Sequence, residues 1–550
     1  MATLTGAGPT ETPSGDKAAG RVGEWCYRIA LPLVLAVGIV GATRVWWVAL
    51  GMWKDEAGIA NNLTRSYFQL TAHLTYDQVA PVGWLWLEKT LLEQVGSGDR
   101  VLRLPAYLGA LAVLVLGTLI ARRAIGRAGA VAVAALLVAS PMLLVYAGEV
   151  KQYSWEAGIA LALLVLAAWA YQALRWTGWG GWWRAVPWVG VTGVAVFVSY
   201  SAILVVAAVT AALAGLHLLR RAWVDAGWLA ALSTPAGATA AYLVYRRHRF
   251  SFYPHQTDYF VGGTAPEGAS PGEFLAWFPF MWGRFVASPM NWDLPWLVLP
   301  FMLVGAVALW RRRRLWAALL VMLFLAAIGG GAARGYPVVQ RPAMYLIAPA
   351  VILVVAGVDG LVRAAAGLGR HRRHLVAAVA SVVLLAAVGA IARPGARLVP
   401  EEIAHPLGKE GLRYGLSDIA DQIRPGDKVL VYYFGNAVTT WYRPLLGIDV
   451  PVYHVRLCRL DRPDDKERRL YDLIGDAKRV FYVQGQLSNV SPKDSFDVTL
   501  RALDAMGSVK ERHEAPTDRV GPHSWALVEL EQVPPTPRPA RTGDPCLEIY

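Results

Sequence analysis

Residues 29–50 read IALPLVLAVGIVGATRVWWVAL, and they are followed at once by GMWKDE at residues 51–56. A helix that crosses a bilayer needs roughly 20 apolar residues, so the first stretch is long enough to span a membrane. Its end is rich in tryptophan, which is typical of the membrane interface. No small-residue cleavage site follows, so we interpret the run as a retained span. The acidic pair Asp55-Glu56 is therefore expected just beyond the membrane surface.

The composition indicates an integral membrane protein. The chain has 550 residues, 55% of them hydrophobic, and 23 tryptophans. Such long and numerous apolar runs exceed what a soluble core needs. The net charge of +13 sits mainly in short loops between apolar runs, as membrane topology requires, and we therefore predict no nucleic-acid partner. Three cysteines are too few for a disulfide framework or a thiolate metal cluster.

Applied along the chain, the same length criterion predicts about eleven membrane spans. The fifth is short and ends at Ser199-Tyr200-Ser201, so the fifth and sixth could also form one long helix. The expected cores are 29–50, 102–121, 128–146, 155–173, 186–199, 202–219, 226–245, 295–310, 315–333, 343–363 and 375–393.

The distribution of basic residues predicts the orientation of these spans. Arginines cluster in every second connection, on the side that also carries the basic N-terminal segment, as the positive-inside rule requires. The clusters are Lys17, Arg21 and Arg28; Arg122, Arg123 and Arg127; Arg175 and Arg184; Arg220 and Arg221; Arg311 to Arg314; and Arg363, Arg370, Arg372 and Arg373. This pattern places Asp55-Glu56, and everything after about Arg393, on the outer side.

The predicted domain organisation follows from these spans. Residues 1–24 are rich in Gly, Thr, Ala and Pro and are expected to form a disordered cytoplasmic tail. Residues 25–394 form the membrane domain, and residues 395–550 a soluble domain on the outer face. The long polar connections all face outward, which predicts an outward-facing active surface. These outer loops are 51–98, 146–154, 246–293 and 334–342.

The C-terminal segment is predicted to be an α/β domain, since no later run is long enough to span. Neither a nucleotide-binding glycine fingerprint nor a nucleophile motif is recognisable in it, so acceptor binding and capping of the membrane site both remain open. The expected elements are a helix over 411–423, a buried strand over 428–434, a helix over 437–446, strands over 479–484 and 525–530, and a proline-rich end over 534–545.

Several short motifs resemble one family of membrane enzymes. The Asp55-Glu56 pair is followed by QVAPVGW at residues 78–84 and by RVLRLP at residues 100–105. Together with the loops 146–154 and 334–342, they are similar to elements of the GT-C glycosyltransferases. The nearest likeness is to the bacterial branch of the protein O-mannosyltransferase and lipid A aminoarabinose transferase group. It covers roughly residues 25 to 395, although Ala-Pro-Val-Gly departs from the commoner Pro-Pro-Leu form.

This resemblance implies a sugar donor carried on polyprenyl phosphate and an acceptor hydroxyl. The implied catalytic residues are Asp55, as general base, and Glu56, which would orient Asp55 or hold a metal. Cations at outer span boundaries would bind the donor phosphate, whose charge grows as the glycosidic bond breaks. The predicted phosphate ligands are Arg103, Lys151, Arg341 and Lys54, and the predicted substrate-binding residues are Glu149, Tyr153 and Tyr336.

Other interpretations of these residues remain. The acids could be solvated loop residues, and the cations could be anchors that snorkel at the interface. Neither His73 nor His255 has a recognisable spacing partner, so we predict no metal site and no certain cofactor. The alternative functions are a lipid or sugar transporter or flippase, although no internal repeat is found, and a non-catalytic GT-C scaffold.

The predicted partners are the polyprenyl-phosphate sugar, the bilayer and an acceptor glycan, glycolipid or protein. The bias toward Ala, Gly, Arg and Val is typical of bacteria with GC-rich genomes. The expected location is therefore the bacterial cytoplasmic membrane, with the active site facing outside.

Overall fold

The computed structural model describes residues 14–175, 183–250, 260–368, 373–406, 408–455, 470–474, 476–485, 496–515 and 523–530. The predicted proline-rich end over 534–545 and the first residues of the predicted N-terminal tail lie outside these ranges. The first helix, α1 (Ser14–Val48), begins inside the segment 1–24 that was expected to be disordered. Alanine and lysine in this part of the segment favour helix, so the helix begins before the candidate span Tyr27–Val48.

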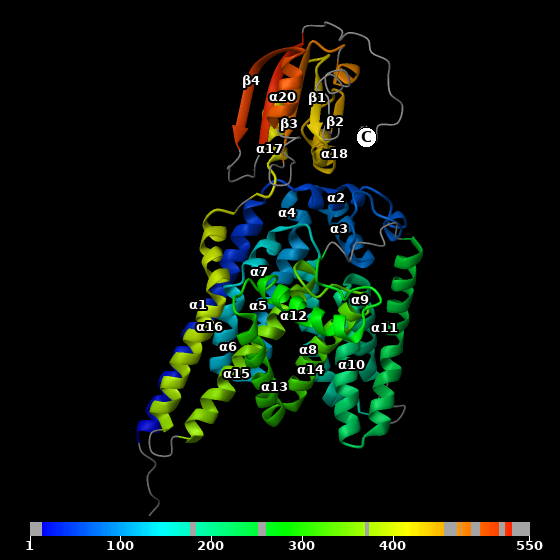
Figure 1. Ribbon diagram of the computed structural model, residues 1–550. Coiled ribbons are helices and arrows are strands. Elements are labelled where there is room, and N and C mark those ends of the chain that lie inside the picture. The colour runs from blue at the N-terminus through cyan, green and yellow to red at the C-terminus, as the bar shows by residue number, and fades with distance from the viewer. Residues whose placement is uncertain are drawn as a thin grey trace, which may run out of the picture.

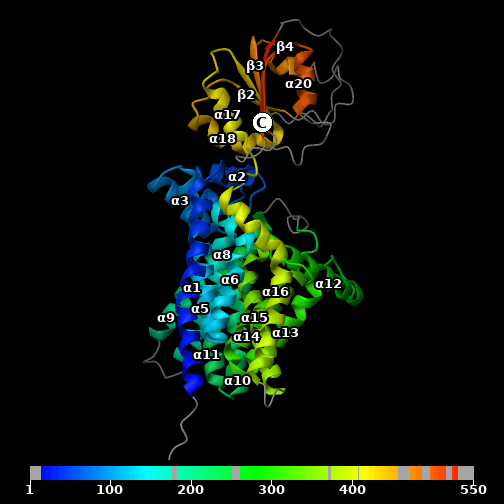
Figure 2. The ribbon, with the colours of Figure 1, turned by 90° about the vertical axis from the view of Figure 1, so that its left-hand side faces the viewer.

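Long apolar helices form the bulk of the molecule, which is a multi-pass membrane protein. Eight helices are long and apolar enough to cross a membrane, and a bent pair brings the number to nine, among the residues that the structure describes. They lie side by side in Figures 1 and 2. The eight are in α1, α5 (Leu104–Ala124), α8 (Tyr153–Ala173), α10 (Ser201–Leu219), α13 (Pro295–Arg312), α14 (Arg314–Ala332), α15 (Ile347–Leu368) and α16 (Arg373–Ala404).

Each of the eleven expected spans contains helix, but three of them differ from a simple apolar span. α9 (Val186–Val198) is short, and it is separate from α10. α11 (Trp223–Phe250) is long, but it is not among the helices that are apolar enough to span. The third is bent by 65° between α6 (Arg127–Val138) and α7 (Pro141–Val145). Pro141 accounts for that break, because proline disfavours helical backbone in the residue before it.

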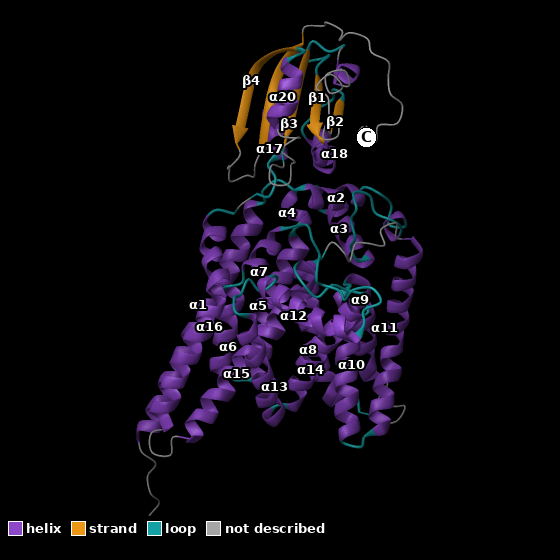
Figure 3. Cartoon of the chain, viewed as in Figure 1, coloured by secondary structure: helices purple, strands orange, loops and turns teal. Residues whose placement is uncertain are grey.

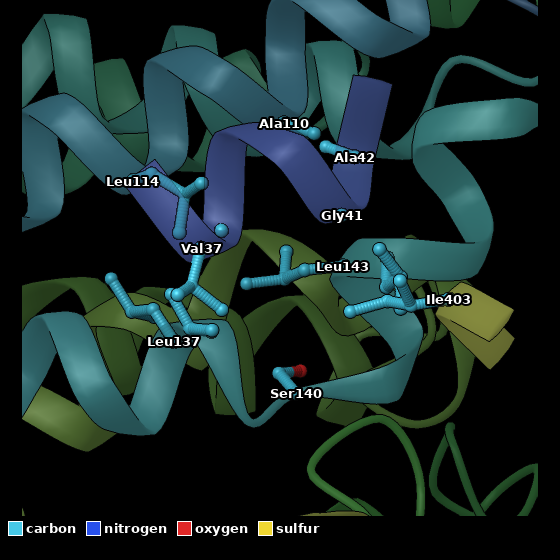
Figure 4. Close-up of a pocket in the computed structure, with 12 residues that line it drawn as sticks. Val37, Gly41, Ala42, Ala110, Leu114, Leu137, Ser140, Leu143 and Ile403 are labelled. Carbon is cyan, nitrogen blue, oxygen red and sulfur yellow. The ribbon is translucent and has the colours of Figure 1, made fainter. Parts of the chain in front are cut away.

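A small apolar cavity accompanies the bend between α6 and α7. Figure 4 shows Val37 of α1 pointing toward Leu137, with Leu143 nearby, and Ala42 next to Ala110. Apart from Ser140, whose hydroxyl is buried without a hydrogen-bond partner, its lining is apolar. Cavities of this kind stay dry, so this one has the properties of a packing gap and not of a polar-ligand site.

The predicted outer loops contribute short helices. The first loop forms α2 (Lys54–Leu63), α3 (Val82–Gln94) and α4 (Asp99–Leu102). α12 (Pro271–Ala287) belongs to the third loop and begins with a capping box between Ser270 and Glu273. Figure 2 shows α12 projecting from the side of the bundle.

The C-terminal domain is a five-stranded sheet with helices, as the α/β pattern predicted (Figure 3). The strand order is β2-β1-β3-β5-β4; β1 pairs in parallel with β2 and β3, and β5 pairs antiparallel with β3 and β4. The strands are β1 (Lys428–Tyr432), β2 (Val452–Val455), β3 (Arg479–Gln484), β4 (Gly507–Ala515) and β5 (His523–Leu530), and the helices include α17 (Leu412–Ala420), α18 (Asn436–Leu445) and α20 (Phe496–Asp504).

The C-terminal domain lies against the first predicted outer loop, at the same end as α2 and α4 (Figure 1). Their apolar side chains form one core cluster, in which Ile59 and Leu63 of α2 join Val438 and Trp441 of α18. Polar contacts reinforce it: the Tyr442 hydroxyl donates to the Asp99 carboxylate at 2.9 Å. The two parts therefore share a continuous apolar interface, which fixes the loop that carries Asp55.

Candidate functional site

The acidic pair occupies the first turn of α2. Trp53 precedes the helix with extended backbone, and its N–H donates to Glu56 Oε2 at 3.4 Å. Negative charge is favoured at a helix N-terminus, where the first N–H groups have no intrahelical partner. Asp55 and Glu56 are neighbours on this turn, so their side chains point in different directions and meet different groups.

Glu56 forms a buried ion pair with Arg103, which lies between α4 and α5. Arg103 Nε and Nη2 donate to the two carboxylate oxygens at 3.0 and 2.9 Å. Glu56 Oε1 also accepts the Val150 N–H at 2.6 Å. The side chains of Glu56 and Arg103 are only 2% and 3% exposed. This bidentate pair therefore links the first predicted outer loop to the start of α5 and to the second predicted outer loop.

Asp55 faces two other cations. Arg341 Nη1 lies 3.2 Å from Asp55 Oδ2 and donates a hydrogen bond to it, and Lys151 Nζ lies 3.8 Å from the same oxygen. Asp55 and Arg341 remain 18% and 16% exposed. The three residues come from three different predicted outer loops, separated by most of the membrane domain in sequence. Unlike the Glu56 pair, this cluster is open to an incoming molecule.

The amine of Lys151 has a second partner. It donates to Gln78 Oε1 at 2.7 Å, and Gln78 in turn belongs to the QVAPVGW motif. Gln78 also lines a cavity of about 270 Å³. Other lining residues are His73 and Val82 of the first outer loop, Phe197 at the end of α9, and Tyr200. The charged cluster is thus one hydrogen bond away from a space large enough to receive part of a substrate.

Electrostatics keep the Asp55 cluster ionised near neutral pH. Burial opposes the charge on Asp55, but Lys151, Arg341 and Lys54 together outweigh it and hold the pKa of Asp55 below its usual value. Burial lowers the pKa of Lys151 to about 8, against the opposing attraction of Asp55. Asp55 is therefore an anion at pH 7, while Lys151 is a cation close to its titration range.

The two predicted tyrosines contact Arg341 and helix α8: Tyr153 lies near Arg341, and Tyr336 binds a residue of α8. The Arg341 guanidinium carbon lies 5.7 Å from the centre of the Tyr153 ring, within cation–π range. The Tyr336 hydroxyl donates to Glu156 Oε2 at 3.0 Å. Glu156 also accepts the Tyr200 N–H at 2.9 Å. Glu156, two residues past the predicted loop, was not identified from the sequence because a lone acid at a span boundary carries no motif.

Two residues just before α17 reach the same region. Lys409 forms an ion pair with Glu149, one of the predicted substrate ligands. Glu410 accepts the backbone N–H of Lys54 at 3.0 Å, and burial raises the pKa of Glu410 to about 7. The Lys54 amine lies 4.8 Å from the centre of the Phe434 ring in the C-terminal domain. Neither Lys409 nor Glu410 was predicted, since adjacent opposite charges in a linker are common on solvated surfaces.

The structure brings Asp55, Lys151, Arg341 and Tyr153 together, and it places Glu56 with Arg103 directly behind them. Lys54, Glu149 and Tyr336 lie at the edges of this cluster, each held by another residue. Among the described residues, one group has the residue types and spacing of a metal site. It lies in the C-terminal domain and includes neither Asp55 nor Glu56.

No protein-family model and no curated protein matches this sequence. The structure is similar to two crystal structures of ArnT from Cupriavidus metallidurans, one bound to undecaprenyl phosphate and one in the apo state. The identity is 16% in both cases. The first similarity covers 92% of this chain and 99% of ArnT with a TM-score of 0.49, and the second covers 95% and 100% with a TM-score of 0.44. Both belong to the lipid A aminoarabinose transferase group that the sequence motifs resemble.

Proposed function

We propose that this protein is a membrane glycosyltransferase that moves a sugar from a polyprenyl-phosphate donor to an acceptor hydroxyl. The observation that carries the proposal is the convergence of Asp55, Lys151 and Arg341 from three separate loops. A carboxylate beside two cations, partly open and next to a cavity, has the groups that such a transfer requires. One of the two ArnT crystal structures has undecaprenyl phosphate bound, and this lipid belongs to the class that we propose as the carrier of the donor.

In the proposed reaction, the acceptor oxygen forms a bond to the anomeric carbon while the bond from that carbon to the phosphate oxygen breaks. Asp55 takes the proton of the acceptor hydroxyl, and polyprenyl phosphate leaves with the bonding electron pair. Lys151 and Arg341 then face the phosphate, whose negative charge has increased. Their contacts with Asp55 hold the two cations in place until the phosphate replaces the carboxylate as their partner.

Glu56 and Arg103 are assigned positioning roles, because each already satisfies the charge of the other. Their pair fixes the first turn of α2, and it therefore fixes the direction in which Asp55 points. This assignment differs from the phosphate contact expected for Arg103 from its position alone. The cavity that Gln78 lines is assigned to the substrate. Glu149, Tyr153 and Tyr336 remain proposed substrate contacts near the Asp55 cluster.

The decisive experiment compares Asp55→Asn with Asp77→Asn in the purified protein. General-base assistance is typically worth 10²–10⁴-fold, so turnover should fall by about that factor in Asp55→Asn. Asp77 is an exposed acid of the same loop with a φ of 56°, a conformation that asparagine also tolerates, which makes it a matched control. Transfer would be measured from a panel of polyprenyl-phosphate sugars. Equal turnover in the two variants would exclude Asp55 as the base.

The outward orientation is a second part of the proposal. Ser66→Cys in the first outer loop and Asp421→Cys after α17 should both react with an impermeant reagent in intact cells of a cysteine-free background. Arg220→Cys, at the opposite end of the bundle, should react only after lysis. Protection of Ser66→Cys in intact cells would contradict the orientation and, with it, the use of a donor at the outer face.

A further inference from the structure

We infer that the C-terminal domain holds a divalent transition-metal ion, such as Zn²⁺, between Asp418, His513 and His523. One ligand atom from each of these residues can be chosen so that all three lie within 4.8 Å of one another. The residues come from α17, β4 and β5, so the ion would join three elements. This site is distinct from the Asp55 cluster, and the inference does not depend on the proposed transferase activity.

The sheet register explains why the two histidines share a face. His513 lies opposite Trp525 on the paired strand, and His523 is two residues before Trp525. Because side chains alternate along a strand, residues 523 and 525 point to the same side of the sheet, and the residue opposite 525 points there too. The imidazole rings of His513 and His523 accordingly lie 5.6 Å apart, centre to centre.

Asp418 approaches this face from α17. Its Oδ2 lies 3.9 Å from His523 Nε2, and it accepts the Trp525 indole N–H at 3.2 Å. A hydrogen bond that orients a ligand carboxylate is typical of metal sites, where such partners support affinity. The tryptophan therefore holds this carboxylate oxygen beside His523.

The ligand set selects the class of metal. Two imidazoles and one carboxylate suit Zn²⁺ and related first-row ions, whereas Ca²⁺ and Mg²⁺ require mostly oxygen ligands. His523 is buried and His513 and Asp418 are exposed, so the ion would be reachable from solvent. Three protein ligands leave a position for water, and shifts of about an ångström would bring the ligand atoms to normal bonding distances near 2.0–2.2 Å.

The location suggests what the ion would do. α17 starts at Leu412, shortly after Lys409 and Glu410, which contact Glu149 and Lys54. Linking α17 to the β4–β5 edge would restrict the segment that touches the membrane domain. Because the ion binds the folded domain and joins three of its elements, it should raise the unfolding temperature of the chain.

The test uses the full-length protein in detergent without an affinity tag, titrated with Zn²⁺ and with Co²⁺ as a spectroscopic substitute. We expect one ion per chain, a visible Co²⁺ spectrum of low coordination number, and a higher unfolding temperature with Zn²⁺. His513→Ala and Asp418→Asn should each weaken binding by at least about tenfold. Asp421→Asn, an exposed acid at the end of the same helix, is the control and should leave binding unchanged.

Both variant positions are exposed, so the substitutions leave the buried core of the domain intact. The absence of Zn²⁺ binding at millimolar concentration would overturn the inference. So would binding that is equally tight in His513→Ala, Asp418→Asn and the control, since that result would place the ion elsewhere on the chain.

Discussion

Asp55 and Glu56 are adjacent acids with opposite environments. Glu56 is sealed in a bidentate pair with Arg103, while Asp55 is partly open and shares Arg341 and Lys151. A fully paired buried carboxylate is suited to holding structure, and an accessible one beside two cations is suited to chemistry. The comparison teaches that one sequence motif can supply both functions, because neighbouring positions on a helix face different directions. The predictions below test that division.

The largest expected effect is on folding, from Glu56→Gln. Removing one partner of a buried ion pair leaves the other charge uncompensated, which typically costs about 3–5 kcal/mol. The free energy of unfolding in detergent should fall by that order. Asp55→Asn should lower it less, because Asp55 and Arg341 are partly exposed to solvent. A stable Glu56→Gln protein that has lost only turnover would mean that Glu56 acts in catalysis and not in positioning.

A smaller effect on stability is expected at Glu410, which joins the two domains. Its pKa of about 7 in the folded protein lies above its usual value, so the folded state holds a proton that the unfolded state releases. Stability should therefore fall as the pH rises from about 4.5 to 7 and stay low above that. Glu410→Gln removes this loss, so it should raise the free energy of unfolding by roughly 3 kcal/mol at pH 8 and change it little at pH 4. Unfolding temperatures at the two pH values measure the difference, and an equal change at both would contradict it.

The two arginines provide the next test. Arg341→Lys keeps the charge but loses the planar fork, so transfer should slow at least about tenfold, equivalent to about 1.4 kcal/mol, with little change in stability. Arg103→Lys should chiefly lower stability, because its fork binds Glu56. Parallel measurements of transfer rate and unfolding temperature separate the two outcomes. If Arg341→Lys is as active as the wild type, Arg341 is an interfacial anchor.

The smallest effect is a pH dependence from Lys151. With a pKa of about 8, its charge is present below that pH and is lost above it. If the cation binds the leaving phosphate, the transfer rate should drop by about half at pH 8 and by about tenfold at pH 9. Lys151→Arg should keep the charge and abolish this limb of the profile. If the transfer rate of Lys151→Arg falls above pH 8 as it does in the wild type, a group other than Lys151 causes the fall.

Much of the candidate site could be predicted from local sequence. The apolar runs define where helices end. The acidic pair lies near such an end, and so do the cations Arg103, Lys151 and Arg341. What could not be predicted is which cation meets which acid. Arg103 and Arg341 were both assigned to the phosphate, yet Arg103 pairs with Glu56, because helix packing places it behind α2. Lys409 and Glu410 were missed for the same reason, since their partners are brought near only by the docking of the C-terminal domain.

The C-terminal domain shows the same limit. β1 and β3 were predicted because buried strands need apolar residues, as in Val429 to Val431. β4 was missed because it is a charged edge strand with no apolar alternation, a form that protects sheet edges from further pairing. His513 on β4, His523 on β5 and Asp418 on α17 therefore had no visible relation in the sequence.

The sequence by itself determined the membrane character, the approximate positions of the helices and the α/β nature of the C-terminal domain. It also determined which acidic and basic residues lie near the helix ends. These properties depend on hydrophobicity and local spacing, which each segment carries alone. Only the tertiary structure decided that Asp55 stays accessible while Glu56 is sealed, and that two histidines and an aspartate converge. Such pairings depend on how distant segments pack, and packing depends on the shapes of all the helices and strands together.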